Sequence, residues 1–333
     1  MLPNLWILFT YFTHMSGMVK TFDFITDQLP FGYAFNFENY LFNKIKHINT
    51  QGIPERADYF IVNNIKKRIE GKIHFLIKDG KAYSPWQSLF GSFEFSPRLH
   101  PNILKDFWQH IEQDLKARQI NEVNITHHAG CYAPIKASNA HKALESSGFS
   151  IKLEAINHHI DIDENPLQSR MHEMEVRRLK KCESNGFEYR QEDLNSSIEI
   201  YDFIEQCRKD QGLSVSISKE KFKTYLDQFP QSYLLFSIRD GSKLIAATVA
   251  VQVCRRILYN FLPASLAEYN SFSPMVMLLE GMYRHCQERN YELLDLGIST
   301  EKDGAHQDSL IAFKEHMGGV ASYKYSYQKN LEV

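Results

Sequence analysis

The residues with the clearest chemical potential lie between Asn270 and Tyr327. Ser273 followed by Pro is typical of a helix start, because Pro fits the first helical position and the Ser oxygen can accept a hydrogen bond from an unpaired backbone N–H. Most such starts bind nothing, but a helix amino end can hold an anion such as pyrophosphate without a basic side chain. Asp295 follows toward the carboxyl end of an apolar strand, where ligands gather in open sheets. A helix start followed by a strand with an acid indicates a phosphate-bearing ligand.

Hydrophobic periodicity predicts the elements that position these residues. Apolar side chains recur at helical spacing after Ser273 and predict a helix with one core face: Met275, Leu278, Leu279, Met282 and Cys286. Two apolar runs, residues 243–253 and 256–262, predict strands before this helix, and residues 293–297 predict a strand after it. The expected order is therefore two strands, a turn, a helix and a strand that carries Asp295.

This order resembles the acyl-CoA-binding core of the Gcn5-related N-acetyltransferase (GNAT) superfamily over about residues 175–330. The narrower resemblance is to the branch of Fem-type peptidoglycan bridge transferases and related acetyltransferases, through Ser273-Pro274 with Leu278-Leu279, Leu294-Asp295-Leu296-Gly297, Phe313-Lys314 and Gly318-Gly319. The chain departs from the common GNAT pattern in one respect. The turn in which Arg or Gln precedes Gly-x-Gly or Gly-x-Ala is absent, and residues 270–275 take its place.

The resemblance implies that a substrate nitrogen or oxygen attacks the thioester of acetyl-CoA or another acyl-CoA, and that the leaving thiolate gains a proton. The expected cofactor-binding residues are Asn270, Ser271, Ser273, Met275 and Val276. Asp295 could act as a general base in a dry cleft, or it could orient the following loop by accepting backbone N–H bonds. Tyr259 could protonate the thiolate, or it could pack across strands. Lys314 could pair with a phosphate or a substrate carboxylate, although exposed helical lysines usually make no specific contact.

The two halves of the chain repeat the same order of predicted elements. Residues 72–78 and 233–239 alternate as strands that turn at Asp79-Gly80 and Asp240-Gly241, and each half continues through further strands and a helix to another strand. A chain of 333 residues also exceeds the size at which single cores usually stop growing. The expected fold class is α/β, more specifically α+β, with two tandem GNAT-like lobes, each a mixed, largely antiparallel sheet flanked by helices.

The boundary between the lobes is expected near residues 164–170, where Glu164-Asn165-Pro166 interrupts a predicted strand. Residues 21–165 would form a degenerate GNAT-like lobe that shapes a substrate cleft, as the family implies, and residues 166–333 the acyl-CoA-binding lobe. Residues 1–20 are expected to be an appendage. Their apolar run at residues 5–12 is too short for a membrane span, and no Lys or Arg precedes it.

Composition narrows the range of partners. The formal net charge of −2 gives no general attraction to nucleic acid or to acidic membranes. The five cysteines are scattered without a Cys-x-x-Cys pair, which indicates neither a zinc framework nor a disulfide scaffold and suits a reducing cytoplasm. No metal site is expected, because a strand spreads His159, Asp161 and Asp163 too far apart for easy joint coordination.

Two residues of the first half are candidates for substrate binding. His127 shares a strand face with Val123 and Ile125 and points either into a cleft or, more often for such residues, into the core. Trp86 belongs to an aromatic-rich stretch that could stack on a sugar or peptide, although such stretches are usually buried. In the second half, charged residues from Glu173 to Arg178 are expected to form a solvated helix face.

The leading hypothesis is an acyltransferase that moves an acyl group from acyl-CoA to an amine of a small molecule, sugar or peptide. A Fem-type transferase that uses aminoacyl-tRNA on a cell-wall precursor is the alternative, but no run of Lys or Arg marks the basic surface it needs. A third hypothesis, motivated by the absent glycine-rich turn, is a binding module that has lost catalysis. No Walker loop, serine nucleophile elbow or His-Glu-x-x-His motif is present, which removes the commoner hydrolase classes.

Overall fold

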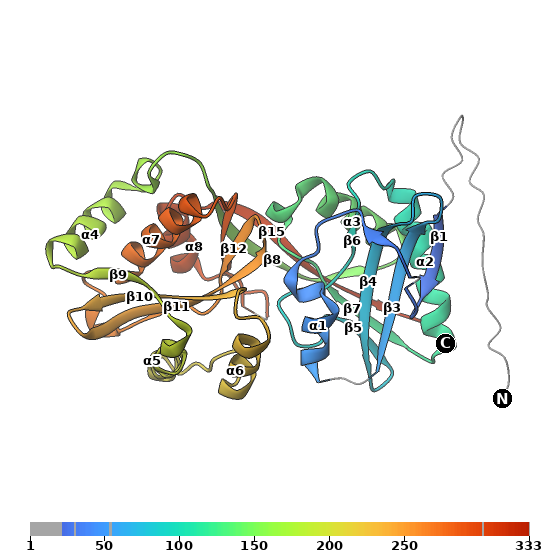
Figure 1. The fold of residues 1–333 in the computed structure, drawn as a ribbon, viewed down its shortest axis with the longest axis horizontal. Coiled ribbons are helices and arrows are strands. Elements are labelled where there is room, and N and C mark those ends of the chain that lie inside the picture. The colour runs from blue at the N-terminus through green and yellow to red at the C-terminus, as the bar shows by residue number, and fades with distance from the viewer. Residues whose placement is uncertain (1–21, 30, 53–54, 302, 333) are drawn as a thin grey trace. The chain divides into compact units, whose positions relative to one another are not determined.

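The computed structural model describes residues 22–29, 31–52, 55–301 and 303–332 (Figure 1). The appendage expected at residues 1–20 lies outside the described residues. The chain divides into two compact units. The first contains the described residues up to Glu154 and those from Lys324 onward, and the second contains Ala155–Tyr323. The division therefore falls within two long strands rather than at residues 164–170.

The second unit contains the elements that surround the candidate site. Its helices are α4 (Glu173–Ser184), α5 (Ser197–Asp210), α6 (Lys219–Gln228), α7 (Pro274–Glu288) and α8 (Asp308–His316), with short 3-10 turns at Leu167–Ser169, Leu194–Ser196 and Ala267–Tyr269. Its strands are β9 (Glu188–Glu192), β10 (Tyr233–Asp240), β11 (Lys243–Cys254), β12 (Ile257–Asn260), β13 (Ala264–Ser265) and β14 (Leu293–Ile298), and it shares β8 (Ser150–Asp161) and β15 (Val320–Asn330) with the first unit. The predicted order of two strands, helix and strand is confirmed.

The sheet of the second unit runs in the order β8-β14-β12-β11-β10-β9, and β13 pairs with β11. β12 and β14 are parallel, whereas β8–β14, β11–β12, β10–β11 and β9–β10 are antiparallel. In Figure 1, α4 and α7 lie on one side of β9, β10 and β11, and α5 and α6 lie on the other. The sheet is therefore mixed, largely antiparallel and flanked by helices, as predicted.

Helix α7 forms the centre of the second unit. Of the apolar positions that predict it, Met275 is partly buried and the others are buried, with Leu278, Met282 and Cys286 fully excluded from solvent. Burying a Leu or Met side chain contributes about 1.5–3 kcal/mol. Gly281 brings this helix close to the sheet, since a Cβ at Gly281 would lie 2.2 Å from the ring of Tyr189 on β9.

The first unit repeats this arrangement. Its elements are β1 (Phe22–Thr26), β2 (Ala34–Phe35), α1 (Ile45–Ile48), β3 (Arg56–Asn63), β4 (Arg68–Lys78), β5 (Lys81–Ser84), β6 (Glu94–Phe95), α2 (Pro101–Ala117), β7 (Glu122–Thr126) and α3 (Pro134–Ser146), with 3-10 turns at Leu41–Asn43, Asn49–Gln51 and Gly130–Tyr132. The strand order is β1-β3-β4-β5-β7-β15. β5 precedes α2 in the sequence, β7 follows it, and the two strands pair in parallel. In the same way β12 precedes α7, β14 follows it, and these two strands pair in parallel. The predicted tandem fold is confirmed.

The solvated face predicted on α4 is wrong at one position. Glu175 is 1% exposed, and its carboxylate accepts a hydrogen bond of 2.7 Å from Arg178. Its neighbours Glu173 and Arg177 form an exposed ion pair of 2.9 Å. Charged residues on different sides of the same helix therefore differ in burial, because Glu175 faces His316 on α8.

Candidate functional site

A cavity of about 610 Å³ lies at the amino end of α7 and the carboxyl ends of β12 and β14. Its walls include Tyr259, Asn270, Ser273, Met275 and Lys314, which are five of the predicted site residues. Arg208, at the end of α5, lines the same cavity. Much of the motif from Ser273 to Lys314 therefore surrounds one space within the second unit, although Asp295 is not among the residues that line it.

The strand register creates the opening. β12 and β14 pair from Ile257↔Leu293 to Tyr259↔Asp295. Beyond this point Asn260 stays paired with β11, and Gly297 and Ile298 stay paired with β8. Hydrogen bonding between β12 and β14 stops after Tyr259. The cavity lies where the two strands are no longer paired.

Gly297 allows Tyr259 to reach the cavity wall. Gly297 has φ of +77°, in the left-handed region, and it follows an irregularity in the pairing of β14 with β8. A Cβ at Gly297 would lie 3.2 Å from the Tyr259 hydroxyl. Tyr259 is half-buried, and burial together with the nearby Asp295 carboxylate raises the pKa of its phenol. The phenol therefore stays protonated at neutral pH and can act as a proton donor.

Asp295 is 2% exposed and shapes the chain around Gly297. Its Oδ1 accepts hydrogen bonds from the Gly297 N–H at 2.8 Å and from Asn157 Nδ2 at 2.9 Å. These contacts match the loop-orienting role that the sequence leaves open for this residue. Asn157, on β8, is a site residue that sequence reasoning missed.

Lys314 is buried rather than exposed as a typical helical lysine is. It is 5% exposed, and its ammonium donates hydrogen bonds to the Gly297 carbonyl at 2.7 Å and the Ile298 carbonyl at 3.0 Å. Burial lowers the pKa of Lys314 to about 8, although the Asp295 carboxylate acts in the opposite direction. Asp295 and Lys314 thus hold the turn at Gly297 from its N–H side and its carbonyl side.

The amino end of α7 differs from the predicted cap. Ser273 has φ of +56° and ψ of +60°, and its hydroxyl donates to the Asn270 carbonyl at 3.3 Å instead of accepting from a helix N–H. The predicted Ser cap is therefore wrong, because the left-handed backbone turns the hydroxyl back along the chain. No described residue accepts a hydrogen bond from the Met275 N–H. That donor remains available for a ligand in the cavity.

The other predicted cofactor residues differ in position. Val276 is fully buried in the core, and its N–H donates to the Ser273 carbonyl at 2.9 Å. Neither the side chain nor the N–H of Val276 is therefore available to a ligand. Ser271 is exposed, and its carbonyl accepts a hydrogen bond of 2.9 Å from Lys181. Asn270 is exposed and lines the cavity. The prediction of Val276 as a cofactor ligand is not supported by these contacts.

The two remaining candidates belong to the first unit. His127 is 3% exposed, neither ring nitrogen has a hydrogen-bond partner among the described residues, and burial holds the pKa of His127 well below its usual range. The ring of His128 lies 4.0 Å from that of His127. Trp86 packs edge-on against Tyr83 with ring centroids 4.7 Å apart, and its backbone N–H donates to Gln51. Neither residue lines the cavity at α7.

Two features are absent from the described part of the chain. It contains no helix with the length and apolar character needed to cross a bilayer. It also contains no group of three or more His, Cys, Asp or Glu side chains arranged to hold a metal ion. Burial raises the pKa of Cys182 and Cys207 to about 11, so these thiols are poor nucleophiles at neutral pH.

Comparison with known proteins shows what part of the second unit and the overall fold are similar to. Residues 171–315 match the family model of an acetyltransferase (GNAT) domain. No curated protein matches the chain in sequence. A crystal structure of FemX has a TM-score of 0.67 and 13% identity over 88% of this chain and 93% of that chain. A tandem GNAT protein from the clavulanic acid biosynthesis pathway, solved without acetyl-CoA, has a TM-score of 0.52 and 11% identity over 84% of each chain.

A third similar structure is the C-terminal domain of a putative lysylphosphatidylglycerol synthetase from Agrobacterium fabrum. Its TM-score is 0.51 and its identity 12%, over 78% of this chain and 81% of that domain. At such low identities these likenesses establish the fold alone, and the family model matches residues 171–315 within the second unit. Residues 171–315 are therefore similar to a GNAT acetyltransferase domain, and the chain as a whole has the fold seen in FemX and in the tandem GNAT protein.

Proposed function

We propose that the protein is an acyltransferase that moves an acyl group from acetyl-CoA or another acyl-CoA to an amine of a small molecule, sugar or peptide. The observation that carries this proposal is the separation of β12 from β14 beside an available N–H at the start of α7. An extended pantetheine arm needs an open strand edge, and a pyrophosphate needs donors at a helix amino end. Both lie in the cavity of about 610 Å³.

In this proposal the pyrophosphate lies against the amino end of α7. The Met275 N–H donates to it, and Asn270 and Ser273 line the same part of the cavity. The positive end of the helix dipole adds to the attraction. Arg208 provides a guanidinium on the cavity wall, where one of its nitrogens donates to the Pro263 carbonyl at 3.2 Å.

The proposed reaction is direct transfer. The amine nitrogen attacks the thioester carbonyl carbon, the new C–N bond forms as the C–S bond breaks, and the amine loses a proton while the CoA thiolate gains one. Tyr259 supplies the thiolate proton, because its phenol stays protonated and lines the cavity next to Gly297. Asp295 and Lys314 act as positioning residues, since both are committed to hydrogen bonds that hold the Gly297 turn.

Aminoacyl transfer of the Fem type is the second candidate, and the likeness to FemX over 93% of that chain favours it. The cavity walls argue for the first candidate. Apart from Arg208, the basic residue on the wall is Lys314, whose ammonium is already bound to two carbonyls. A tRNA would need several more phosphate contacts than one arginine supplies. We further propose that the protein works in the cytoplasm, where acyl-CoA and reduced cysteines occur together.

Two assays test the proposal together. Titration calorimetry with acetyl-CoA should give a saturable binding heat, and a coloured thiol reagent should detect CoA release when a panel of amines, amino sugars and peptides is added. Binding without release points to an untested acceptor and retains the cofactor site. Absence of binding heat at millimolar acetyl-CoA contradicts the cofactor site itself.

A further inference from the structure

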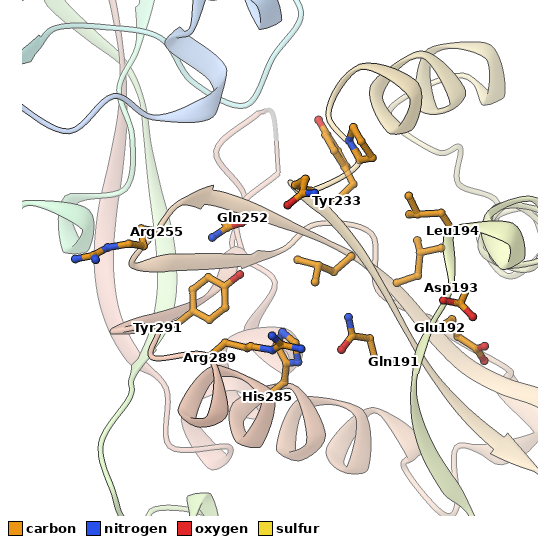
Figure 2. Close-up of a pocket in the computed structure, with 14 residues that line it drawn as sticks. Gln191, Glu192, Asp193, Leu194, Tyr233, Gln252, Arg255, His285, Arg289 and Tyr291 are labelled. Atoms are coloured by element: carbon orange, nitrogen blue, oxygen red, sulfur yellow. The ribbon is translucent and has the colours of Figure 1, made fainter. Parts of the chain in front are cut away.

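A second cavity, of about 480 Å³, lies over the opposite end of α7 (Figure 2). Its walls include Gln191 from β9, Gln252 from β11, His285 and Arg289 from the last turn of α7, and Tyr291. Since α7 has 15 residues and an α-helix rises about 1.5 Å per residue, its two ends lie about 22 Å apart. This cavity is therefore distinct from the one beside Ser273.

Some polar side chains of this second cavity form no hydrogen bond or ion pair within the described residues. Among the described residues, Arg289 forms no ion pair, and the side-chain amides of Gln191 and Gln252 form no hydrogen bond. His285 is 6% exposed, and its Nε2 also has no hydrogen-bond partner there. Buried polar groups are normally satisfied, so the unpaired Nε2 of the buried His285 indicates a missing ligand or water, whereas Arg289 and Gln191 are exposed and free to meet a ligand from solvent.

Neighbouring arginines behave differently. Arg239 on β10 forms an ion pair of 2.9 Å with Glu192, and Arg284 on α7 forms one of 3.0 Å with Glu280. The Glu192 carboxylate lines the second cavity, but Arg239 and the Ser237 hydroxyl already bind it. The Glu192 carboxylate is therefore neutralised, whereas the exposed Asp193 carboxylate at the rim and the Arg289 guanidinium form no ion pair with a described residue.

The arrangement of the side chains is convergent. Figure 2 shows Tyr291 and Gln191 extending toward the same space from opposite sides, with His285 and Arg289 rising from the end of α7 between them. Arg255 lines the rim, but its side chain points away from this group. Burial and the positive charge of Arg289 lower the pKa of His285, so the imidazole is neutral at physiological pH and Arg289 carries the local charge.

We propose that this cavity binds a small molecule through a carboxylate or phosphate group, with Arg289 as its ionic partner. His285, Tyr291 and Gln191 serve as neutral hydrogen-bond partners around it. The carboxyl end of the α7 dipole opposes an anion only weakly there, because the carbonyls of His285 and Cys286 already accept bonds from the Arg289 and Tyr291 N–H groups. A guanidinium matches the two oxygens of a carboxylate or phosphate in a forked geometry.

The test uses the full chain and detects ligand binding through the NMR signal of the His285 ring. It requires no enzymatic turnover. Histidine side chains are labelled with ¹³C, the His285 ring signal is assigned with His285→Gln, and phosphate or succinate is added at constant ionic strength. We expect a saturable shift of the His285 signal, at least about tenfold weaker binding in Arg289→Gln, and binding within about twofold of the wild type in Arg255→Gln. Phosphate and succinate added separately distinguish the two ligand classes.

Two results overturn the proposal. One is a His285 signal that does not move saturably with phosphate or with succinate. The other is an equal loss of binding in Arg255→Gln and Arg289→Gln, which indicates general charge attraction rather than a site. Circular dichroism checks that both variants fold. Because no acyl-CoA is present, failure here leaves the proposed acyl transfer untouched.

Discussion

Replacing Gly297 by Ala tests the geometry of the proposed acyl-CoA cavity. Gly297 has φ of +77°, and a Cβ there would lie 3.2 Å from the Tyr259 hydroxyl and 3.3 Å from Cε2 of its ring. The left-handed backbone costs an alanine about 1–2 kcal/mol. Moving Tyr259 out of the tight contact costs about 1–3 kcal/mol more, as in other overpacked sites.

The matched control is Gly186→Ala. Gly186 has φ of +74°, and a Cβ there would meet no atom within 4 Å, so this variant carries the backbone cost without the steric contact. We expect urea unfolding to show a loss of about 1–2 kcal/mol for Gly186→Ala and about 2–5 kcal/mol for Gly297→Ala.

Binding separates the two variants more clearly than stability does. Because the displaced Tyr259 ring narrows the cavity, Gly297→Ala should bind acetyl-CoA at least about tenfold more weakly, which corresponds to about 1.4 kcal/mol. Gly186→Ala should bind as the wild type does. Calorimetry at a temperature where both variants are folded measures the difference. Wild-type affinity in Gly297→Ala, or an equal loss in both variants, refutes the assignment of Tyr259 to the cavity wall.

Three further predictions concern the hydrogen bonds around Gly297. Tyr259→Phe should retain acetyl-CoA binding and lower kcat by about 10²–10⁴, measured by thiol release, because it removes the proposed proton donor but not the ring; an unchanged kcat excludes that role. Asn157→Leu should cost about 1–3 kcal/mol in urea unfolding, because Asp295 loses the donor 2.9 Å from its Oδ1; a change below about 0.5 kcal/mol contradicts this. Lys314 should titrate near its lowered pKa of about 8 in ¹³Cε NMR. The native state then binds fewer protons than the unfolded chain between about pH 8 and pH 10.5, so the Lys314 contribution to stability rises with pH in that window and is lost as pH falls through 8; a pKa near 10.5 shows that the ammonium is solvated.

The fold could be predicted where periodicity is strong. The apolar spacing from Met275 to Cys286 predicts α7, and the alternating runs before it predict β11 and β12, because burial of one face imposes these periods. The return of residues 324–332 to the first unit could not be predicted. Strand pairing across some 200 residues, as between Thr126 and Ser326, leaves no local pattern in the sequence.

The candidate site was predictable in part. Tyr259 and Asp295 could be singled out because they interrupt or end apolar strands, and the register then places them side by side. Asn157 was missed, since one polar residue in a mixed strand carries no signal of a partner 138 residues away. The cap at Ser273 was mispredicted, because residue preference does not reveal a left-handed backbone. The burial of Lys314 depends on the carbonyls of a turn that only the tertiary structure forms.

The Met275 amide tests the central claim most directly, because its N–H is the donor proposed to meet the CoA pyrophosphate. We expect its ¹H–¹⁵N signal, assigned with Met275→Leu, to shift downfield and saturate as CoA is added, and to move little with pantetheine, which lacks the pyrophosphate. The amide of Arg118 at the end of α2, bonded to the Asp114 carbonyl at 3.0 Å, serves as the internal reference and should stay in place. A Met275 signal unaffected by CoA, or moved equally by pantetheine, contradicts the cofactor site at α7.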